Sequence, residues 1–357
     1  MRILQLTDDL ERGGVQRVVV GLANGLAAAG DEVFVAAGDG PLWADLRGVG
    51  GAPQRAFRKP GVREVVHSAT RLRTLVSELG IEIVDVHQRR LALIATHTLR
   101  RTNTIIIEHV HSRFDDHRWL SYRAPTLVAV GTDVAHSLKE TYRKQYQRVI
   151  QINNGVPDPF PDGGIPVLPP AKPLRLVAIG RLVKEKDPWF FSKIVKNLRS
   201  LGVDVKATWV GDGPLRRDVR SNTVVDWVGE TTDVTSYLIR SHALVVTSLR
   251  EGLPLVAIEA LASGRPVLTR DVGSCADVVR PGRSGILWPL NDSPEKAARL
   301  LINNLGLLDA AKARERLSTL GERARELYER EFTLEKMVVE TRSLYKRVVC
   351  ECGKAPC

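Results

Sequence analysis

The chain has 357 residues, of which 43% are hydrophobic and 26% charged, a composition typical of globular proteins and not of disordered segments. This length exceeds one ordinary core and suits two domains. The formal net charge of +11 favours an anionic partner, but basic residues are spread over both halves, which argues against a dedicated nucleic-acid surface.

The sequence contains no obvious targeting or membrane-spanning segment. No run approaches the roughly 20 apolar residues of a membrane span. The N-terminal stretch MRILQLTDDLERGG lacks the apolar block and small-residue cleavage site of a secretory signal. We therefore expect a cytoplasmic protein, for which the net charge still allows weak peripheral association with an anionic membrane.

In the first half, short apolar strands alternate with longer helical patterns. Helices are predicted at Val15–Ala29 and Val62–Leu79. Such alternation predicts a parallel sheet with helices on both faces. The predicted strands are Ile3–Thr7, Glu32–Ala36, Ile83–Val86, Thr104–Glu108, Thr126–Val130 and Val149–Ile152.

A proline-rich segment interrupts this alternation, because seven of the residues from 153 to 173 are proline. After it the pattern restarts. Strands are predicted at 174–179, 205–210, 224–228, 243–247 and 266–269, and helices at 188–201, 254–263, 294–305, 308–330 and 333–349.

The fold class is therefore α/β, with two doubly wound Rossmann-like domains whose parallel sheets face a central cleft. We assign residues 1–157 to an acceptor-binding domain, 158–173 to a linker and 174–330 to a second domain. Residues 331–357 form a final helix, expected to return to the first domain, and a cysteine-containing tail. Ligands should bind at the carboxyl ends of the strands.

A glycine pair lies between the first strand and the helix that follows it. Gly13 and Gly14 allow close approach of a ligand to the backbone, and the helix start presents free N–H groups. A phosphate or an acceptor hydroxyl fits this place, although tight turns between strands and helices use glycine anyway.

The second domain opens with GRLVKEKD, residues 180–187, directly after a strand. Arg181 and Lys186 stay protonated at neutral pH and could meet a diphosphate from two sides. Taken alone, the two residues could equally be solvated surface charges.

The segment EGLPLVAIEALASGRPV, residues 251–267, is the most specific pattern. Glu251 precedes a helix, and Glu259 lies about two turns deeper on a similar side. Two carboxylates so placed suit hydroxyl groups of a sugar and of a ribose. An unpaired carboxylate in the apolar helix around Glu259 would be costly, so it needs a ligand or a structural arginine.

These motifs occur in an order that resembles the retaining GT-B glycosyltransferases of family 4. The motifs are GGVQR at 13–17, NNGV at 153–156, GRLVKEKD, VGDGP at 210–214 and the two glutamates of 251–259. The resemblance covers nearly the whole chain and is densest over 174–290.

The resemblance implies roles for the matching residues. Arg181 and Lys186 would neutralise the departing diphosphate, Glu251 would bind the donor sugar, and Glu259 would hold the ribose. The backbone of Gly14, and the loop and helix start formed by Gly252, Leu253, Pro254, Leu255 and Val256, would lie near the phosphates.

A histidine after a strand of the first domain is expected beside the transferred sugar. His109, in TIIIEHVH, fits this position better than His111. His87, in IVDVH, fits acceptor binding or a structural role. We place Gly13, His87 and His111 at the acceptor and His109 among the catalytic residues with Arg181, Lys186 and Glu251.

Two departures from the family pattern put the donor sugar in doubt. The usual G-G-x-x-E reads GSCAD at 273–277, and the usual aspartate before strand 243–247 is His242. No metal site and no cofactor are expected. The adjacent acids Asp8-Asp9 and Asp115-Asp116 point apart in an extended chain and offer no cage of ligands.

The resemblance implies transfer of a sugar from a nucleotide-diphosphate sugar, UDP-type favoured, with retention of configuration. The leaving diphosphate would itself accept the proton of the acceptor hydroxyl, without a metal. The alternatives are a sugar-nucleotide epimerase on the same scaffold and a non-catalytic sugar-nucleotide-binding subunit. A basic stretch at 55–73 could face a membrane or an anionic acceptor, or be the solvated side of a helix; it contains Arg55, Arg58, Lys59, Arg63, Arg71 and Arg73.

Overall fold

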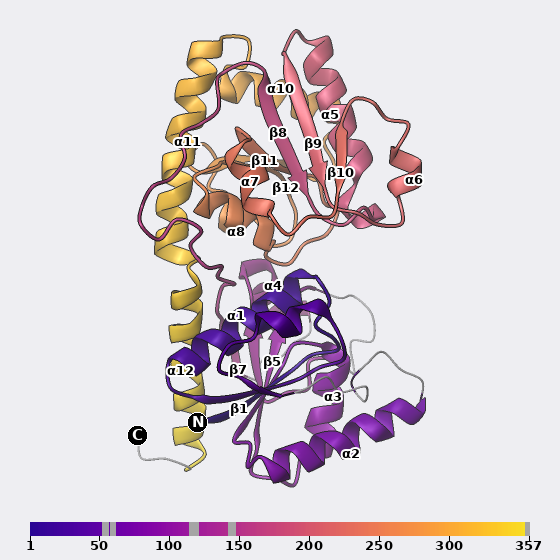
Figure 1. Ribbon diagram of the computed structural model, residues 1–357, viewed down its shortest axis with the longest axis vertical. Helices are drawn as coiled ribbons and strands as arrows, with labels where there is room; N and C mark the ends of the chain where they lie inside the picture. The colour runs from indigo at the N-terminus through magenta and orange to yellow at the C-terminus, as the bar shows by residue number, and fades with distance from the viewer. Residues whose placement is uncertain (52–56, 58–61, 114–120, 142–147, 354–357) are drawn as a thin grey trace. The chain divides into compact units, whose positions relative to one another are not determined.

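The computed structural model describes residues 1–51, 57, 62–113, 121–141 and 148–353, and divides into two compact units (Figure 1). Unit 1 comprises Met1–Pro157 and Thr333–Cys357, and unit 2 comprises Asp158–Phe332. Five residues singled out in the sequence, and one side chain, lie outside the described parts: Arg55, Arg58, Lys59, Asp115, Asp116 and the side chain of Arg63.

Within the described residues, unit 1 contains a parallel sheet in the order β3-β2-β1-β4-β5-β6-β7. The chain runs outward from β1 in one direction through β2 and β3, and in the other from β4 onward. The strands are β1 (Arg2–Leu6), β2 (Glu32–Ala36), β3 (Gly50–Gly51), β4 (Ile83–Val86), β5 (Ile105–Val110), β6 (Thr126–Ala129) and β7 (Arg148–Gln151).

Helices α1 (Gly14–Ala28), α2 (Val62–Glu78), α3 (Arg89–Thr98), α4 (Thr132–His136) and α12 (Leu334–Glu351) belong to unit 1. The last of these, α12, packs along α1 (Figure 1). Close packing depends on Gly25, where a Cβ would lie 2.3 Å from Val338 Cγ2. Arg342 of α12 also donates to the buried Asp31 over 2.6 Å. The end of the chain is thus built into the first unit.

Unit 2 contains a second parallel sheet, in the order β10-β9-β8-β11-β12-β13, which is the 3-2-1-4-5-6 order of a Rossmann fold. Its strands are β8 (Leu174–Ile179), β9 (Val205–Val210), β10 (Asp226–Gly229), β11 (Ala243–Val246), β12 (Val267–Asp271) and β13 (Gly285–Pro289).

Helix α5 (Pro188–Ser200) packs against α10 (Pro294–Leu305) over one part of this unit's core. Helix α8 (Leu255–Ala262) packs against α11 (Ala310–Glu331). Shorter helices complete the unit: α6 (Arg216–Val219), α7 (Val234–Ile239) and α9 (Cys275–Val278). In β9 the odd positions Val205, Ala207 and Trp209 are buried in the core.

The proline-rich segment 158–173 packs on unit 2. The buried guanidinium of Arg265 donates to the carbonyl of Pro166 over 2.9 Å, and Leu168 packs against the hydrophobic core. Asp158 pairs with the buried Arg325 of α11. The start of this segment is therefore fastened by an ion pair within the second unit.

The predicted α/β class with two parallel-sheet domains is confirmed, and the strands differ from the predicted ones in detail, as the following two show. Strand β5 continues to Val110, two residues beyond the predicted end at Glu108, and its last residues are buried like the apolar residues before them. Strand β13, Gly285–Pro289, was not predicted, since its sequence GILWP ends in a proline.

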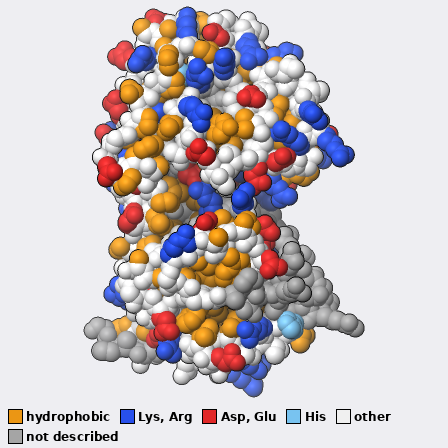
Figure 2. Space-filling view, in the orientation of Figure 1, with side chains coloured by type: hydrophobic (Ala, Val, Ile, Leu, Met, Phe, Trp, Pro, Cys, Tyr) orange, Lys and Arg blue, Asp and Glu red, His pale blue; other side chains and the backbone are white. Residues whose placement is uncertain are grey.

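On the face that Figure 2 presents, Lys and Arg side chains are scattered over both units among Asp and Glu. They form no single basic stripe on the described surface of that face. Among the described helices, none is both long and apolar enough to cross a bilayer.

Candidate functional site

The predicted donor residues of unit 2 lie where its sheet changes direction. Strands β8 and β11 are adjacent in the sheet, and the chain leaves them toward opposite edges. Loops after two such strands diverge and leave a crevice at their carboxyl ends. Arg181 and Lys186 follow β8, and Glu251 follows β11.

Lys186 and Glu251 meet at this point. Lys186 Nζ lies 2.5 Å from Glu251 Oε1, and the side chains are 30% and 10% exposed. The loops themselves are joined by backbone, since Leu249 N donates to Glu185 O over 2.8 Å. The structure thus brings one predicted cation and one predicted acid into direct contact.

Arg270 of β12 donates hydrogen bonds to both of these loops. Its Nη1 donates to Asp187 Oδ2 over 2.9 Å and to the Thr247 carbonyl over 2.7 Å. Asp187 also caps α5, accepting from Phe190 N over 3.1 Å, in a left-handed conformation with φ 48°. A carboxylate that holds both a helix start and a buried arginine fixes the backbone beside Lys186. Sequence analysis missed Arg270, whose only signal is a charge inside the strand VLTRD.

Helix α8 begins at Leu255, with Pro254 at its N-cap. No side chain caps this end and no acid lies in the first turn, so its first N–H groups carry no side-chain acceptor there. Gly252, Leu253 and Pro254 are buried beside it. Together with Val256 they form the loop and helix start that sequence analysis predicted.

The other two predicted residues differ in exposure. Glu259 lies in the second turn of α8, half-buried, and has a polar or charged partner of its own. Arg181 is exposed, and its side chain makes no hydrogen bond or ion pair with any residue that the structure describes.

The two departures from the family pattern have local structural explanations. Gly273 has φ 56°, and a Cβ there would lie 2.0 Å from Glu251 O, so the β12–α9 loop packs directly on the loop of Glu251. Ser274 N donates to Gly252 O over 2.9 Å. His242 is buried, and its Nδ1 accepts from Arg175 N over 2.8 Å, which joins the start of β8 to β11.

In unit 1 the corresponding change of direction lies between β1 and β4. Gly13 is the N-cap of α1, in extended conformation, and Gly14 is the first helical residue and is exposed. A Cβ on Gly13 would lie 2.3 Å from Gln16 Oε1. Asp8 and Asp9 accept from Arg90 and Gln16 respectively, so each has a protein partner.

His87, His109 and His111 lie together at the carboxyl ends of β4 and β5. His87 Nδ1 is 3.0 Å from His111 Nε2, and the His87 and His109 ring centroids are 4.8 Å apart. His87 and His109 are buried, and His111 is half-buried. Because β5 ends at Val110, His109 lies inside the strand and His111 follows it. This reverses the expected strand-end placement, although both histidines belong to the cluster.

Three further side chains that sequence analysis missed support this cluster. Asp85 Oδ2 lies 3.5 Å from Nε2 of both His87 and His109. Tyr345 of α12 donates its hydroxyl to Asp85 Oδ2, and Gln5 Oε1 lies 2.6 Å from His87 Nε2. All three are fully buried.

The electrostatics of the cluster follow from burial and from Asp85. Burial lowers the pKa of His109 to about 4, against the attraction of Asp85, so this imidazole is neutral at neutral pH. The pKa of His111 is lowered in the same direction by burial. Burial would raise the pKa of Asp85, but His109, His87 and the Tyr345 hydroxyl hold it below its usual value. Asp85 is therefore ionised.

The three imidazoles also have a spacing that could hold a metal ion, since one nitrogen from each lies within 4.8 Å of the others. His109 Nε2 has no hydrogen-bond partner among the described atoms. Among the described residues, this cluster is therefore the place where a metal ion could bind.

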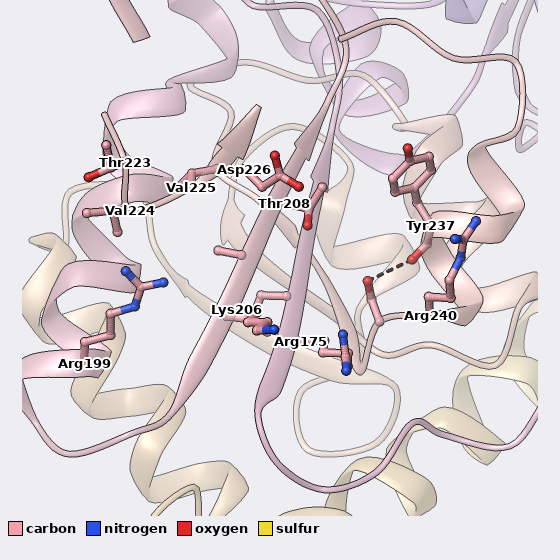
Figure 3. A pocket seen from close by; sticks show the side chains of 13 residues that line it. Arg175, Arg199, Lys206, Thr208, Thr223, Val224, Val225, Asp226, Tyr237 and Arg240 are labelled. Atoms are coloured by element: carbon pink, nitrogen blue, oxygen red, sulfur yellow. Dashed lines mark hydrogen bonds between the residues drawn. The ribbon is translucent and has the colours of Figure 1, made fainter. Parts of the chain in front are cut away.

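A separate hollow of about 540 Å³ lies in unit 2 at the amino-terminal ends of β8 and β9 (Figure 3). Arg175, Arg199, Lys206 and Arg240 line it with a single acid, Asp226. These strands carry Arg181 and the VGDGP loop at their other ends, so the hollow contains none of the predicted site residues.

Comparison with known proteins gives consistent results over both units. Residues 173–306 match the family described as glycosyl transferases group 1, and residues 12–158 match glycosyltransferase family 4. An uncharacterized glycosyltransferase of Haemophilus influenzae is 25% identical over 308 residues, which are 82% of this chain and 87% of the relative. The N-acetyl-alpha-D-glucosaminyl L-malate synthase of Bacillus anthracis is 30% identical over 169 residues, 44% of this chain and 40% of that protein.

Solved structures show the same fold. A glycosyltransferase from Rickettsia africae has a TM-score of 0.78 at 16% identity, covering 98% of both chains. The Anabaena protein HepE in complex with UDP-glucose has a TM-score of 0.76 at 14% identity, covering 97% of this chain and 100% of that one. These neighbours identify the architecture as GT-B and confirm the fold expected from the sequence.

Proposed function

Because the chain belongs to the group 1 and family 4 glycosyltransferases, we propose that it transfers a sugar from a nucleotide-diphosphate sugar to an acceptor hydroxyl. In this proposal the anomeric configuration is retained and no metal takes part in the transfer step. The acceptor binds to unit 1 and the donor to unit 2.

The contact between Lys186 and Glu251 supports this proposal best. The two residues come from loops on either side of the switch point, and the Glu251 side chain is only 10% exposed. A diphosphate beside Lys186 and sugar hydroxyls beside Glu251 would use the ammonium as donor and the carboxylate as acceptor. The pair therefore offers both chemistries that an activated sugar requires.

The phosphate end of the donor fits the start of α8. Its first N–H groups have no side-chain cap, and an anion is stabilised at the positive end of a helix. Arg181 supplies a second cation, which the described residues leave available for a ligand. Glu259, half-buried in the second turn, is proposed to bind the ribose.

The chemical step needs little from the protein beyond placement and charge. As the bond from the sugar to the diphosphate breaks, negative charge grows on the leaving oxygen, and Lys186 and Arg181 stabilise it. That oxygen accepts the proton of the acceptor hydroxyl, which attacks from the same face. His109, neutral by virtue of its lowered pKa, contributes hydrogen bonds without adding charge beside the sugar.

The UDP type of donor is favoured by the relatives. The Anabaena neighbour was solved with UDP-glucose, and an Escherichia coli relative that is 31% identical over 124 residues is named as a UDP-Gal-dependent galactosyltransferase. Those 124 residues are only 32% of each chain, so the sugar itself is left open in the proposal.

A panel of UDP-, GDP- and ADP-sugars, read by thermal shift, tests the donor. A matching donor at about 100 times its Kd stabilises the protein by about 2.7 kcal/mol. Incubation with the donor alone then separates transfer from epimerisation, because a transferase leaves the sugar stereochemistry unchanged. A panel without any stabilising nucleotide sugar would refute the proposal.

Two further measurements test the finer claims. NMR of the product shows retention if the new glycosidic bond has the configuration of the donor, and the opposite anomer would contradict it. Activity after treatment with excess chelator should be unchanged. A loss that zinc restores would instead assign a metal to the three-histidine cluster.

A further inference from the structure

A chain of buried hydrogen bonds connects the histidine cluster of unit 1 to the last helix, and the transfer proposed above makes no use of it. It runs from Asp85 through the Tyr345 hydroxyl to Gln5 and from there to His87 and His111. The Gln5 Nε2 to Tyr345 Oη distance is 3.3 Å, Gln5 Oε1 to His87 Nε2 is 2.6 Å, and His87 Nδ1 to His111 Nε2 is 3.0 Å.

The direction of this chain is set at its buried end. An ionised carboxylate can only accept, so the single proton of the Tyr345 hydroxyl is donated to Asp85. The hydroxyl oxygen must then accept from Gln5, which identifies the Gln5 atom facing it as the amide nitrogen. The amide oxygen of Gln5 therefore faces His87 and can only accept.

The same reasoning continues through the imidazoles. His87 Nε2 must carry a proton to donate to Gln5 Oε1, and Asp85 at 3.5 Å favours the same nitrogen as the proton site. A neutral imidazole has one N–H, so Nδ1 of neutral His87 is bare. It can then only accept, and His111 Nε2 must donate to it. Nδ1 is left as the only acceptor nitrogen of neutral His111.

We propose that Tyr345 is a positioning residue: its hydroxyl fixes the His87 tautomer and thereby presents His111 Nδ1 as a hydrogen-bond acceptor for a second, non-reacting hydroxyl of the acceptor substrate, which it orients. The part concerning the substrate rests on the proposed function. The part concerning the tautomer does not.

The fold holds Tyr345 firmly enough for such a role. Gln5 and Asp85 are register partners on the adjacent strands β1 and β4, so their side chains leave the same face. Helix α12 is fixed beside them by the close contact at Gly25 and by the bond from Arg342 to Asp31. With Tyr345 fully buried, water does not compete for its hydroxyl.

Long-range proton–nitrogen NMR of the full chain labelled with ¹⁵N-histidine tests the tautomer directly, without any ligand. We expect neutral His87 and His111 in the native protein to carry their protons on Nε2. In Tyr345→Phe, the Gln5 amide is free to rotate, so His87 should show the Nδ1–H form in a substantial share of molecules. Tyr328→Phe is the matched control, because it removes another buried hydroxyl, in unit 2.

A second variant guards against misfolding of the first. Gln5→Met keeps the bond from Tyr345 to Asp85 and removes the bonds of the Gln5 amide to Tyr345 and to His87, so it should cause the same change of tautomer. A native His87 with its proton on Nδ1, or an unchanged tautomer in whichever of these variants folds, would overturn the proposal.

Kinetics test the positioning role. Loss of the fixed tautomer should lower kcat by roughly 10- to 100-fold, the scale for a misplaced reacting group, while KM for the donor stays within about twofold. Tyr328→Phe should retain native kcat. A changed tautomer with native kcat would overturn the role in transfer. If the protein transfers no sugar at all, the proposed function fails while the NMR result still decides the tautomer.

Discussion

Replacing Lys186 by methionine tests the centre of the unit 2 site. The substitution keeps the unbranched stem and removes the ammonium that lies 2.5 Å from Glu251 Oε1. Glu251, 10% exposed, then loses its cation. Leaving such a group without its partner costs about 1–3 kcal/mol, less than for a fully buried pair because Lys186 is itself 30% exposed. At about 2 kcal/mol, a unit of this size loses roughly 4–8 °C in Tm.

The kinetic effect should be larger than the effect on stability. If the ammonium stabilises the departing diphosphate, its loss lowers kcat by about 100-fold. The matched control is Lys184→Met, which removes an exposed lysine from the same turn. Both variants are compared by calorimetry and by transfer from the identified nucleotide sugar, and Lys184→Met should be native in both.

A double variant separates charge pairing from catalysis. In Lys186→Met with Glu251→Gln no unpaired carboxylate remains, so Tm should recover most of its loss. The low kcat should persist, because a neutral pair still leaves the diphosphate without its cation. Recovery of kcat together with Tm, or near-native turnover in folded Lys186→Met, would show that Lys186 acts only as a partner of Glu251.

Three other expectations follow from the structure. Arg181→Met should lower kcat by about 100-fold at unchanged Tm, since the exposed Arg181 has no partner among the described residues; native kcat would remove it from the mechanism. Gly273→Ala should lower Tm and donor affinity more than Gly282→Ala does. Both glycines have positive φ, but only at Gly273 would a Cβ lie 2.0 Å from Glu251 O. Equal effects of the two substitutions would contradict this. The free energy of unfolding should fall by at most about 3 kcal/mol as pH drops from about 6.5 to about 4, because His109 binds a proton in the unfolded chain and stays neutral when buried. Denaturant titrations of His109→Asn should show a flatter dependence of this free energy on pH, and a dependence identical to that of the native protein would refute the reasoning.

The unit 2 site could be predicted from the sequence because its residues follow predicted strands of one sheet. Alternating strands and helices imply a parallel sheet, and in a parallel sheet the loops after successive strands share one edge. That rule alone places Lys186 and Glu251 at the same edge. Their pairing in the structure, with Leu249 bonded to Glu185, shows two neighbouring loops in register. Direct contact between these two side chains was not predicted, because each was assigned to a different part of the ligand.

The support beneath that site could not be predicted in the same way. Arg270 stands in a short strand where it could equally have faced solvent. Its partners Asp187 and Thr247 become neighbours only when three strands are assembled. A charge within an apolar strand is costly unless it is paired, so such a residue is at least a sign of a buried network. Asp85, a charged residue within the apolar strand IVDV, is likewise a sign of a buried network.

The histidine cluster shows why distance along the chain limits sequence reasoning. His87, His109 and His111 were recognised because each ends or follows a predicted strand. The residue that orients them, Tyr345, lies 258 positions beyond His87 on a helix with ordinary amphipathic periodicity. Nothing in that helix distinguishes Tyr345 from any other core residue, and only its packing on α1 brings the hydroxyl to Asp85.

The Lys186–Glu251 pair and the histidine cluster therefore depend on different parts of the chain. The contacts around Lys186 and Glu251 are all made by residues of unit 2 between β8 and α9. The direction of the hydrogen bonds around His87 depends instead on α12, which follows unit 2 in sequence but belongs to unit 1. Since the two networks share no residue, substitutions in one should add to substitutions in the other in folding free energy. The last helix thus contributes hydrogen bonds to the histidine cluster and does not merely cover the sheet.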